Sequence, residues 1–334
     1  MKSKSDQAIS VLGLGNWGTA LANHLATAGH SVLGWTIEEE IVQGIKENRR
    51  NPCFQSQTEL SKNLEATLDL KACLKNQIVL FALPAVALSD VVPRLLLEDG
   101  AIFISAVKGL EQKTLLTPLQ FAKQNLPNKN VFFTVLSGPS FAKDLVDGRP
   151  AGIVSASNKP EIAKRVAEIF SNETLKIYTS SDPLGVEIGG IVKNVIALAA
   201  GVCDGLQLGD SARAGLITRG LAEIMRLATA MGANPKTLAG LSGLGDLVLT
   251  ATSTTSRNYT VGARLGSGES LDHIIQTLGS TAEGVTTTPL VLSLASKHSV
   301  EMPICMAVNR ILTGESTPTA VVQELISRPL KEEF

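Results

Sequence analysis

Three glycines near the N-terminus have the spacing of a dinucleotide-binding loop. Gly13, Gly15 and Gly18 follow a short apolar run, 9–12, and precede a helical pattern over 17–28. In such a loop the first glycine permits a tight turn, the second lets the backbone approach a pyrophosphate, and the third lets the helix pack on the sheet. The free N–H groups at the start of the helix would then face the phosphates. A flexible turn is the alternative, but the flanking strand and helix favour dinucleotide binding.

Two lysines lie where proton-transfer chemistry could take place. Lys108 follows an apolar strand-like run, and open α/β sheets bind ligands at the carboxyl ends of their strands. Lys193 lies in an apolar helical stretch, where burial would lower its pKa toward a range useful for proton transfer. Gly189 and Gly190, about one turn earlier, would leave room for a ligand. Lys108 could equally be an ordinary exposed residue, and Lys193 could pair with a buried acid, although Glu187 lies off its face of the helix.

A polar cluster over 253–258 could hold a phosphate. Arg257 can donate two hydrogen bonds to one phosphate group, and neighbouring hydroxyl and amide groups could complete the site. Upstream, Asp246 and Thr250 are one helical turn apart and could face the same pocket. On spacing alone, a solvated loop remains an alternative for the cluster, and helix capping remains one for Asp246.

The first half of the chain alternates short apolar runs with helical patterns. Runs this short and this continuously apolar are typical of strands buried on both faces of a parallel sheet. They predict an α/β fold with an N-terminal Rossmann-like doubly wound sheet. The expected strands are 9–12, 31–35, 78–82, 101–107, 131–136 and 153–156, with connecting helices at 17–28 and 111–124.

The pattern changes near residue 183, after which few strands are indicated. Pro183 suits the first turn of a helix, with Asp182 as its cap. We therefore expect a dinucleotide-binding Rossmann domain over 1–183 and an all-helical substrate-binding and catalytic domain over 184–334. The expected helices of the second domain are 186–202, 212–231, 271–278, 288–296 and 319–326.

Composition narrows the class of protein. Thirty basic and 31 acidic residues give a net charge of −1, so no overall field favours nucleic acid or an acidic membrane. The four cysteines lack CxxC spacing and the four histidines form no ligand pair, so we expect neither a metal site nor a disulfide framework. Charges or prolines interrupt the most apolar stretches, 78–97 and 186–202, and the N-terminus lacks the apolar core of a signal peptide. We expect a soluble, cytoplasmic protein without membrane insertion, in which many of the 29 glycines serve close packing.

The ordered set of motifs resembles the bacterial NAD(P)-dependent glycerol-3-phosphate dehydrogenase family over nearly the whole chain. This resemblance implies reversible reduction of dihydroxyacetone phosphate to sn-glycerol 3-phosphate with NAD or NADP. It also implies a homodimer that supplies the glycerol backbone of phospholipids, with no nucleic-acid partner. The segments are GLGNWGTALA (13–22), KGLE (108–111), SGPSFAKDL (137–145), EIGGIVKNVIALAAGVCDG (187–205), LITRGLAE (216–223), GLGDLVLT (243–250), SRN (256–258) and EG (283–284).

The resemblance implies the roles of the expected site residues, and spacing adds Thr250 to them. Lys193 would be the general acid and base, and Lys108 would contact both cofactor and substrate. The substrate-binding residues would be Lys108, Gly138, Ser140, Lys193, Asn194, Asp246, Thr250, Ser256, Arg257 and Asn258. The cofactor-binding residues would be Gly13, Gly15, Asn16, Trp17, Gly18, Lys108, Ala142, Arg257 and Glu283.

Two departures from the family pattern stand out. Ser211 and Gly215 replace the usual Asn and Ala, which puts local packing or a minor contact in question. The segment 36–38 lacks the basic residue often found there, and the acidic run 38–40 would repel a 2′-phosphate. The nearest basic residues, Lys46, Arg49 and Arg50, would have to fold back from beyond the next helix to replace that residue. We therefore expect efficient use of NADH without a strong preference for NADPH, although the acids could simply mark a helix N-terminus.

Two other functions fit parts of the same pattern. One is a Rossmann dehydrogenase with a catalytic lysine that acts on a β-hydroxyacid. The other is a non-enzymatic redox sensor that binds NAD(P), which would keep the glycine loop and need no buried lysine. Turnover of dihydroxyacetone phosphate, without turnover of hydroxyacids, distinguishes the expected enzyme from both.

Overall fold

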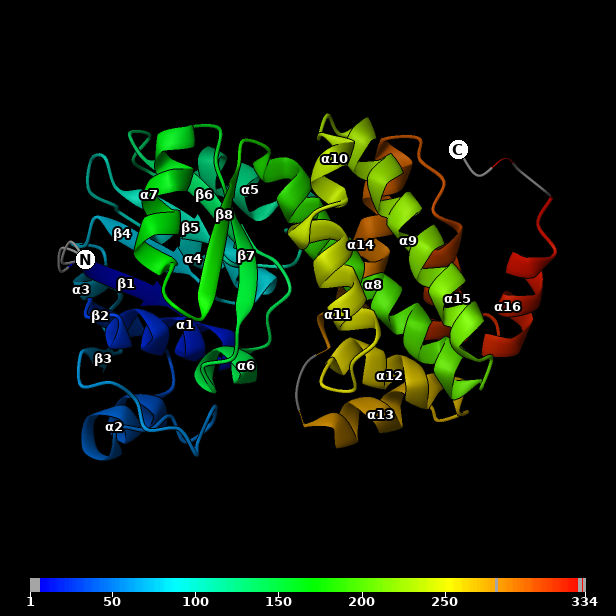
Figure 1. The fold of residues 1–334 in the computed structure, drawn as a ribbon, viewed down its shortest axis with the longest axis horizontal. Coiled ribbons are helices and arrows are strands. Elements are labelled where there is room, and N and C mark those ends of the chain that lie inside the picture. Colours follow the sequence, from blue (N-terminus) through cyan, green and yellow to red (C-terminus); the bar gives the residue numbers. More distant parts are fainter. Residues whose placement is uncertain (1–6, 280–281, 330–331, 333–334) are drawn as a thin grey trace. The chain divides into compact units, whose positions relative to one another are not determined.

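An eight-stranded sheet forms the frame of the first of two units in the computed structural model, which describes residues 7–279, 282–329 and 332 (Figure 1). The units are Met1–Glu187 and Ile188–Phe334. The strand order is β3-β2-β1-β4-β5-β6-β7-β8, and neighbouring strands are parallel except β6 and β7. The strands are β1 (Ala8–Leu12), β2 (Ser31–Trp35), β3 (Leu64–Thr67), β4 (Ile78–Phe81), β5 (Ile102–Ser105), β6 (Phe132–Ser137), β7 (Ala151–Ala156) and β8 (Leu175–Ser180).

The predicted doubly wound sheet is confirmed, and each predicted strand overlaps an observed one. The edge strands β3 and β8 were not predicted. Only Leu64 of β3 is buried, so this strand has no apolar run. In β8, buried Leu175 and Ile177 alternate with exposed Lys176 and Tyr178, as expected for a strand with one face in solvent.

Helices supply the apolar side chains that cover the sheet. α1 (Asn16–Thr27), α6 (Ala142–Val146) and α7 (Pro160–Phe170) share one core with alternate strand residues such as Ile104 and Leu136. α5 (Pro118–Asn125) packs against β6. The other helices of this unit are α2 (Glu39–Asn48), α3 (Leu70–Cys73), η1 (Ala85–Ala87), α4 (Leu88–Val91) and η2 (Val92–Arg94).

The helix predicted over 111–124 is wrong in its first half. α5 begins only at Pro118, with Thr117 as its N-cap. Proline suits the first helical position because its missing N–H needs no partner there, but it cannot continue a helix from upstream. The residues before it form a hydrogen-bonded turn around Glu111 instead.

In the second unit, every regular element of the described residues is a helix, as predicted. α8 (Pro183–Gly205) begins in the first unit, and the Gly185 N–H donates to the Asp182 carboxylate at 3.0 Å, which confirms the predicted cap. The others are α9 (Asp210–Ala230), α10 (Pro235–Leu238), the π-helical turn η3 (Leu241–Gly245), α11 (Asp246–Ala251), α12 (Arg257–Gly266), α13 (Leu271–Leu278), α14 (Glu283–Lys297), α15 (Pro303–Leu312) and α16 (Pro318–Ile326).

Glycines bring α8 and α12 into backbone contact. A Cβ atom on Gly201 would lie 2.1 Å from the Tyr259 carbonyl oxygen, and one on Gly262 would lie 2.0 Å from that of Leu198. No side chain fits at such positions, which confirms that small residues provide close packing here. One described helix, α8, is long and apolar enough to cross a membrane, but its apolar window is entirely buried, so it is a core helix.

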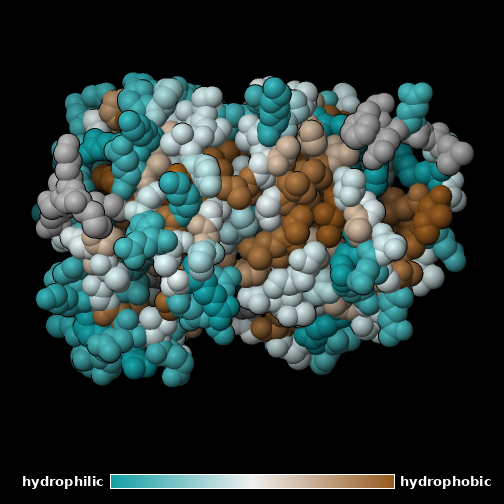
Figure 2. Space-filling model, viewed as in Figure 1, coloured by the Kyte–Doolittle hydropathy of each residue, from teal (hydrophilic) through white to brown (hydrophobic). Residues whose placement is uncertain are grey.

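The surface of the second unit is unevenly apolar. Figure 2 shows a broad apolar area (brown) where Figure 1 draws α9, α10 and α11. Leu244 and Val248, in η3 and α11, are among the exposed large apolar side chains of this unit. All four cysteines of the chain are free thiols, and the described residues contain no group of metal-binding side chains.

Candidate active site

The glycine loop lies between β1 and α1, at the point where the strand order reverses from β1 to β4. Gly13 has a φ of +103°, a left-handed conformation that a side chain would strain. A Cβ atom on Gly18 would lie 1.9 Å from the Gly13 carbonyl oxygen, so the helix packs directly on the turn. A Cβ atom on Gly15 would meet nothing within 4 Å. No side chain caps the first N–H groups of α1. The turn at Gly13 and the close packing at Gly18 are as predicted, and pyrophosphate binding beside Gly15 stays a prediction.

The segment after α2 makes hydrogen bonds that support this loop. The sequence analysis did not predict these contacts. The buried Asn51 side chain donates to the Leu14 carbonyl and to the Thr19 hydroxyl, both at 2.9 Å. The Gln55 amide donates to the Asn16 side chain at 2.5 Å. Nothing in the spacing of a single asparagine marks such a contact, because it joins residues 37 apart.

The same segment decides which basic residues lie near the loop. The chain does fold back after α2, through Arg49 in a left-handed conformation. The Arg49 guanidinium donates to the carbonyls of Ser61 and Leu64, so it is engaged in backbone contacts within the fold. Arg50 is exposed and donates to the Ser56 carbonyl at 3.2 Å.

Acidic side chains follow β2, where a dinucleotide ribose is read in this fold. Glu38 is the N-cap of α2, yet its carboxylate caps no helical N–H and instead accepts from the Thr36 hydroxyl. Glu40 accepts a hydrogen bond from the Cys53 thiol, and this bond, together with burial, raises the pKa of Cys53 to about 11. The acidic run thus lies at the N-terminus of α2, as the helix-terminus alternative expected, with Glu39 and Glu40 in the first turn. Cys53 stays a thiol at neutral pH.

The remaining predicted residues of the first unit lie after β5 and β6. Lys108 is half-buried, three residues beyond the end of β5. Gly138 follows β6 with a φ of +152°, and a Cβ atom there would lie 2.8 Å from Ile153 Cα. Ser140 donates to the Gly138 carbonyl at 3.2 Å, and Ala142 starts α6, which packs against α1. β5 and β6 are parallel neighbours, so Lys108 and Gly138 lie at the same edge of the sheet.

In the second unit, Lys193 forms a buried cluster with Asp246 and Thr250. Its amine donates to the Asp246 carboxylate and to the Thr250 hydroxyl, both at 2.6 Å. The side chains are only 7% and 1% exposed for Lys193 and Asp246. Asp246 and Thr250 thus lie on one face, as their spacing predicted, and the pocket expected there stays a prediction. The acid that pairs with Lys193 is therefore Asp246, and a carboxylate this close favours the charged amine, opposing the effect expected from burial alone.

Gly189, near Lys193, does not serve the purpose expected from spacing. A Cβ atom on Gly189 would lie 2.6 Å from the Ser242 carbonyl oxygen of η3. Gly189 thus makes room for the backbone of the π-helical turn rather than for a ligand. This close approach brings the start of α11, and with it Asp246, to the lysine.

The predicted phosphate cluster lies at the N-terminus of α12. Ser256 caps this helix by accepting from the Tyr259 N–H at 3.3 Å, and Arg257 is exposed in its first turn. The buried Asn258 side chain accepts from the Gly284 N–H at 2.8 Å, which joins α12 to the first turn of α14, where Glu283 lies. A helix N-terminus with an exposed arginine can bind an anion.

Three other predicted positions have simpler surroundings. Asn194 is buried in α8, and its carbonyl oxygen lies 2.8 Å from where a Cβ atom of Gly284 would be. Ser211 and Gly215 lie exposed on α9, and a Cβ atom on Gly215 would meet nothing within 4 Å. No packing contact explains either departure from the family pattern.

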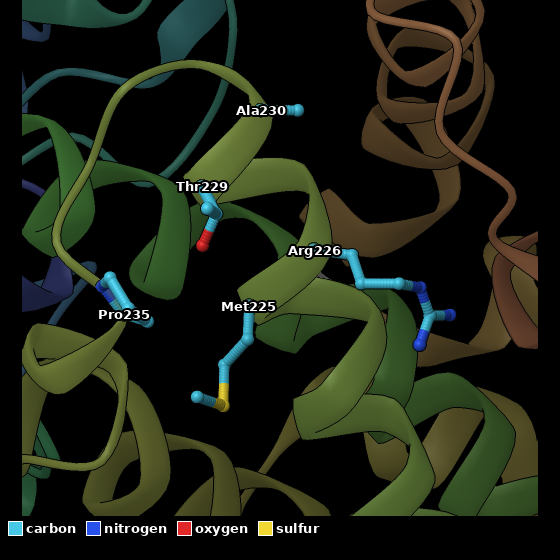
Figure 3. Close-up of a pocket in the computed structure, with 5 residues that line it drawn as sticks. All are labelled: Met225, Arg226, Thr229, Ala230 and Pro235. Carbon is cyan, nitrogen blue, oxygen red and sulfur yellow. The ribbon is translucent and has the colours of Figure 1, made fainter. Parts of the chain in front are cut away.

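A shallow apolar hollow of about 430 Å³ lies apart from these clusters in the second unit. Figure 3 shows its lining, Met225, Arg226, Thr229 and Ala230 of α9 and Pro235 of α10. None of the predicted site residues lines it. The Arg226 guanidinium donates to the Glu301 carbonyl at 3.3 Å, and the lining offers no group suited to proton transfer.

The loop at the switch point leaves open space beside Gly15, and the buried Lys193 amine lies beside the Asp246 carboxylate. These properties place the protein in the class of NAD(P)-dependent oxidoreductases with a Rossmann-type sheet. Residues 8–163 match the family model for the N-terminus of NAD-dependent glycerol-3-phosphate dehydrogenase, and residues 182–323 match that for its C-terminus. The chain belongs to the NAD-dependent glycerol-3-phosphate dehydrogenase family.

Individual relatives agree with the family models. The chain is 43% identical to glycerol-3-phosphate dehydrogenase [NAD(P)+] of Rhodospirillum rubrum over 328 residues, 97% of this chain and 93% of that protein. It is 43% identical to the Bacillus licheniformis protein of the same name, over 96% of this chain and 94% of that one. A crystal structure of glycerol-3-phosphate dehydrogenase from Coxiella burnetii has a TM-score of 0.92 at 37% identity, covering 97% of this chain and 99% of that chain.

Proposed function

We propose that the protein catalyses the reversible reduction of dihydroxyacetone phosphate to sn-glycerol 3-phosphate with NADH or NADPH. The observation that carries this proposal is the buried Lys193–Asp246–Thr250 cluster in a chain that also holds a complete dinucleotide loop. Family membership over nearly the whole chain supports the substrate. The β-hydroxyacid alternative lacks that support, and a redox sensor would have no use for a buried lysine.

The glycine loop holds the pyrophosphate of the dinucleotide through backbone N–H groups at the start of α1. When bound, the reduced nicotinamide supplies the hydride that is added to the substrate's carbonyl carbon. Asn16 and Trp17 lie in the first turn of α1, and Asn16 is held there by Gln55. Ala142 contributes from α6, Arg257 and Glu283 from α12 and α14.

Lys193 supplies the proton in the direction of reduction. Its ammonium donates to the substrate's carbonyl oxygen, which becomes the C2 hydroxyl, and in reverse the neutral amine takes that proton back. Asp246 and Thr250 accept hydrogen bonds from the amine and orient it. Lys108 contacts both cofactor and substrate at the carboxyl edge of β5.

The substrate's phosphate binds Arg257 and the N-terminus of α12, with Ser256 and Asn258 beside it. Asn194, Gly138 and Ser140 complete the substrate contacts. Cofactor choice follows from Glu38 and its neighbours, which favour a free ribose hydroxyl over a 2′-phosphate. We also propose a cytoplasmic homodimer that supplies glycerophospholipid synthesis, and light scattering on the purified protein tests the dimer.

A spectrophotometric assay tests the proposed function. NADH and NADPH oxidation is followed with dihydroxyacetone phosphate, with dihydroxyacetone and with a panel of β-ketoacids. Turnover of the phosphorylated triose alone is expected. Turnover of a ketoacid instead would support the alternative dehydrogenase, and cofactor binding without any turnover would support the sensor.

A further inference from the structure

One buried carboxylate, Glu187, binds the start of a neighbouring helix. It lies in the second turn of α8 and is 3% exposed. Its two carboxylate oxygens accept hydrogen bonds from the Leu119 N–H at 2.8 Å and from the Thr117 hydroxyl at 2.7 Å. Burial raises the pKa of Glu187 to about 7, and these hydrogen bonds and Lys123 oppose that rise. The contact joins the start of α8 to the N-terminus of α5.

α5 has a complete cap of its own without this carboxylate. The Thr117 hydroxyl accepts from the Gln120 N–H at 3.4 Å, and the Gln120 side chain accepts from the Thr117 N–H at 3.1 Å. Pro118 has no N–H to satisfy. Glu187 therefore accepts from two donors that the local cap does not use, the Thr117 hydroxyl and the Leu119 N–H. Its contact connects two segments of the chain and is not needed to cap α5.

The segment at one end of this tie begins at Lys108. Between Lys108 and Thr117, the buried Glu111 carboxylate accepts from the Thr114 N–H at 2.7 Å and from the Lys113 N–H at 3.1 Å. The Glu111 N–H donates to the Leu116 carbonyl at 3.0 Å. Hydrogen bonds thus fix residues 111–116, which connect Lys108 to Thr117 along the chain.

The segment at the other end carries Lys193. α8 runs without a break from Glu187 to Lys193, a rise of about 9 Å along one continuous helix. We propose that Glu187 is a positioning residue for the reaction, which fixes the start of the Lys193 helix to the end of the Lys108 segment. This inference rests on the proposed function, since it gives Glu187 a purpose only if both lysines act in one reaction.

A second buried glutamate provides the matched control. Glu223 of α9 is 2% exposed, and its carboxylate accepts from the Ile304 N–H at 2.7 Å and the Cys305 N–H at 3.2 Å, at the start of α15. Like Glu187, Glu223 is a buried carboxylate that accepts hydrogen bonds at the start of a neighbouring helix, although both of its donors are backbone N–H groups. Neither α9 nor α15 carries a residue of the proposed mechanism, so Glu223 reports what loss of such a tie costs in stability alone.

The test compares Glu187→Ala, Glu187→Gln and Glu223→Ala in the full-length protein. Dihydroxyacetone phosphate reduction is measured, and kcat is expressed per NADH-binding site from a fluorescence titration. We expect Glu187→Ala to lower kcat by roughly 20- to 100-fold with the KM for NADH little changed, because displacement of a catalytic group by about 1 Å costs on this order. Glu187→Gln should recover most of the activity, since its oxygen can accept from Leu119 and its amide can donate to the Thr117 hydroxyl. Glu223→Ala should lose thermal stability but keep kcat per site.

Equal kcat per site in Glu187→Ala and Glu223→Ala would overturn the inference and leave the proposed function intact. An inactive wild-type protein would overturn both. If Glu187→Ala fails to fold, Thr117→Val decides. It keeps the carboxylate in place and removes the hydroxyl that donates to Glu187 and accepts from the Gln120 N–H. Its kcat per site should fall about 3- to 10-fold and be restored in Thr117→Ser, as for loss of one hydrogen bond of about 1 kcal/mol; an unchanged kcat in Thr117→Val would overturn the inference.

Discussion

The candidate site residues differ between the two units. In the glycine loop of the first unit the absence of side chains leaves space, whereas the second unit contributes charged side chains. Around the glycine loop, a positive φ at Gly13 and open space beside Gly15 let the backbone itself face a dinucleotide. In the second unit, Lys193 and Asp246 form a buried ion pair at 2.6 Å, and Arg257 is exposed at the start of α12. Adding an atom is therefore the informative change in the first unit, and removing one is the informative change in the second.

The largest effect is expected from removing the lysine amine. Lys193→Ala should lower kcat about 100- to 10,000-fold, because general acid–base groups contribute on that order. Affinity for NADH should stay nearly the same, since the glycine loop is untouched. Steady-state kinetics and NADH titration measure both quantities, with the exposed Lys236 of α10 changed to Ala as the control. A variant that keeps more than about a third of wild-type kcat would exclude Lys193 from proton transfer.

A smaller loss is expected from removing the guanidinium. Arg257→Ala should lower kcat/KM for dihydroxyacetone phosphate roughly 10- to 150-fold, which corresponds to about 1.5–3 kcal/mol for hydrogen bonds to a charged group. The slow reaction with dihydroxyacetone, which lacks the phosphate, should be affected far less. Equal proportional losses with both substrates would show that Arg257 does not bind the phosphate.

Two glycines of one loop should respond in opposite ways to an added methyl group. Gly15→Ala should weaken NADH binding roughly tenfold, because the new atom occupies space kept for the ligand. The unliganded protein should be stabilised by a few tenths of a kcal/mol. Gly15 has an extended backbone, with a φ of −68° and a ψ of −171°, that alanine can also adopt, and alanine restricts the unfolded chain.

Gly18→Ala should instead destabilise the fold, because its Cβ atom would lie 1.9 Å from the Gly13 carbonyl oxygen. The expected loss is about 1–3 kcal/mol in the free energy of unfolding. Thermal unfolding with and without NADH separates the two variants. If Gly15→Ala lost stability without NADH, the space beside Gly15 would serve packing and not a ligand.

The parts of this architecture that sequence predicts are those set by local patterns. The observed bounds of β2 and α13 match the predicted ones, because each element is a contiguous sequence pattern ended by turn residues. The spacing of Asp246 and Thr250 predicted a common face, because one helical turn separates them.

What sequence does not predict is set by contacts between distant segments. Asn51 supports Leu14 from 37 residues away, and Lys193 meets Asp246 from 53 residues away. Gly189 was expected to leave room for a ligand, but the space goes to the Ser242 carbonyl. The pattern on one helix reveals a small residue without revealing which neighbour fills the space, and only the packing of η3 on α8 decides it.

The smallest effect concerns the choice between NADH and NADPH. Exposed carboxylates follow β2, Arg49 is committed to backbone carbonyls, and Glu38 is held by Thr36 beside the end of the strand. A 2′-phosphate would meet repulsion there, so NADH should be used efficiently and without a strong preference for NADPH. Glu38→Gln should raise kcat/KM for NADPH by about threefold to fivefold, as for removal of one exposed charge worth under about 1 kcal/mol.

Glu39→Gln, one residue further along α2, is the matched control and should change the cofactor ratio less. The comparison is made at low ionic strength, where repulsion between exposed charges is least screened, and the difference between the two variants should shrink when salt is added. A wild-type preference for NADPH above about 30-fold, equivalent to about 2 kcal/mol, would contradict the prediction. Such a preference would indicate that the exposed Arg50 binds the 2′-phosphate. Arg50 precedes Asn51, whose side chain is hydrogen-bonded to the glycine loop. Loss of that preference in Arg50→Ala would then show that a charged side chain also binds the ligand in the first unit.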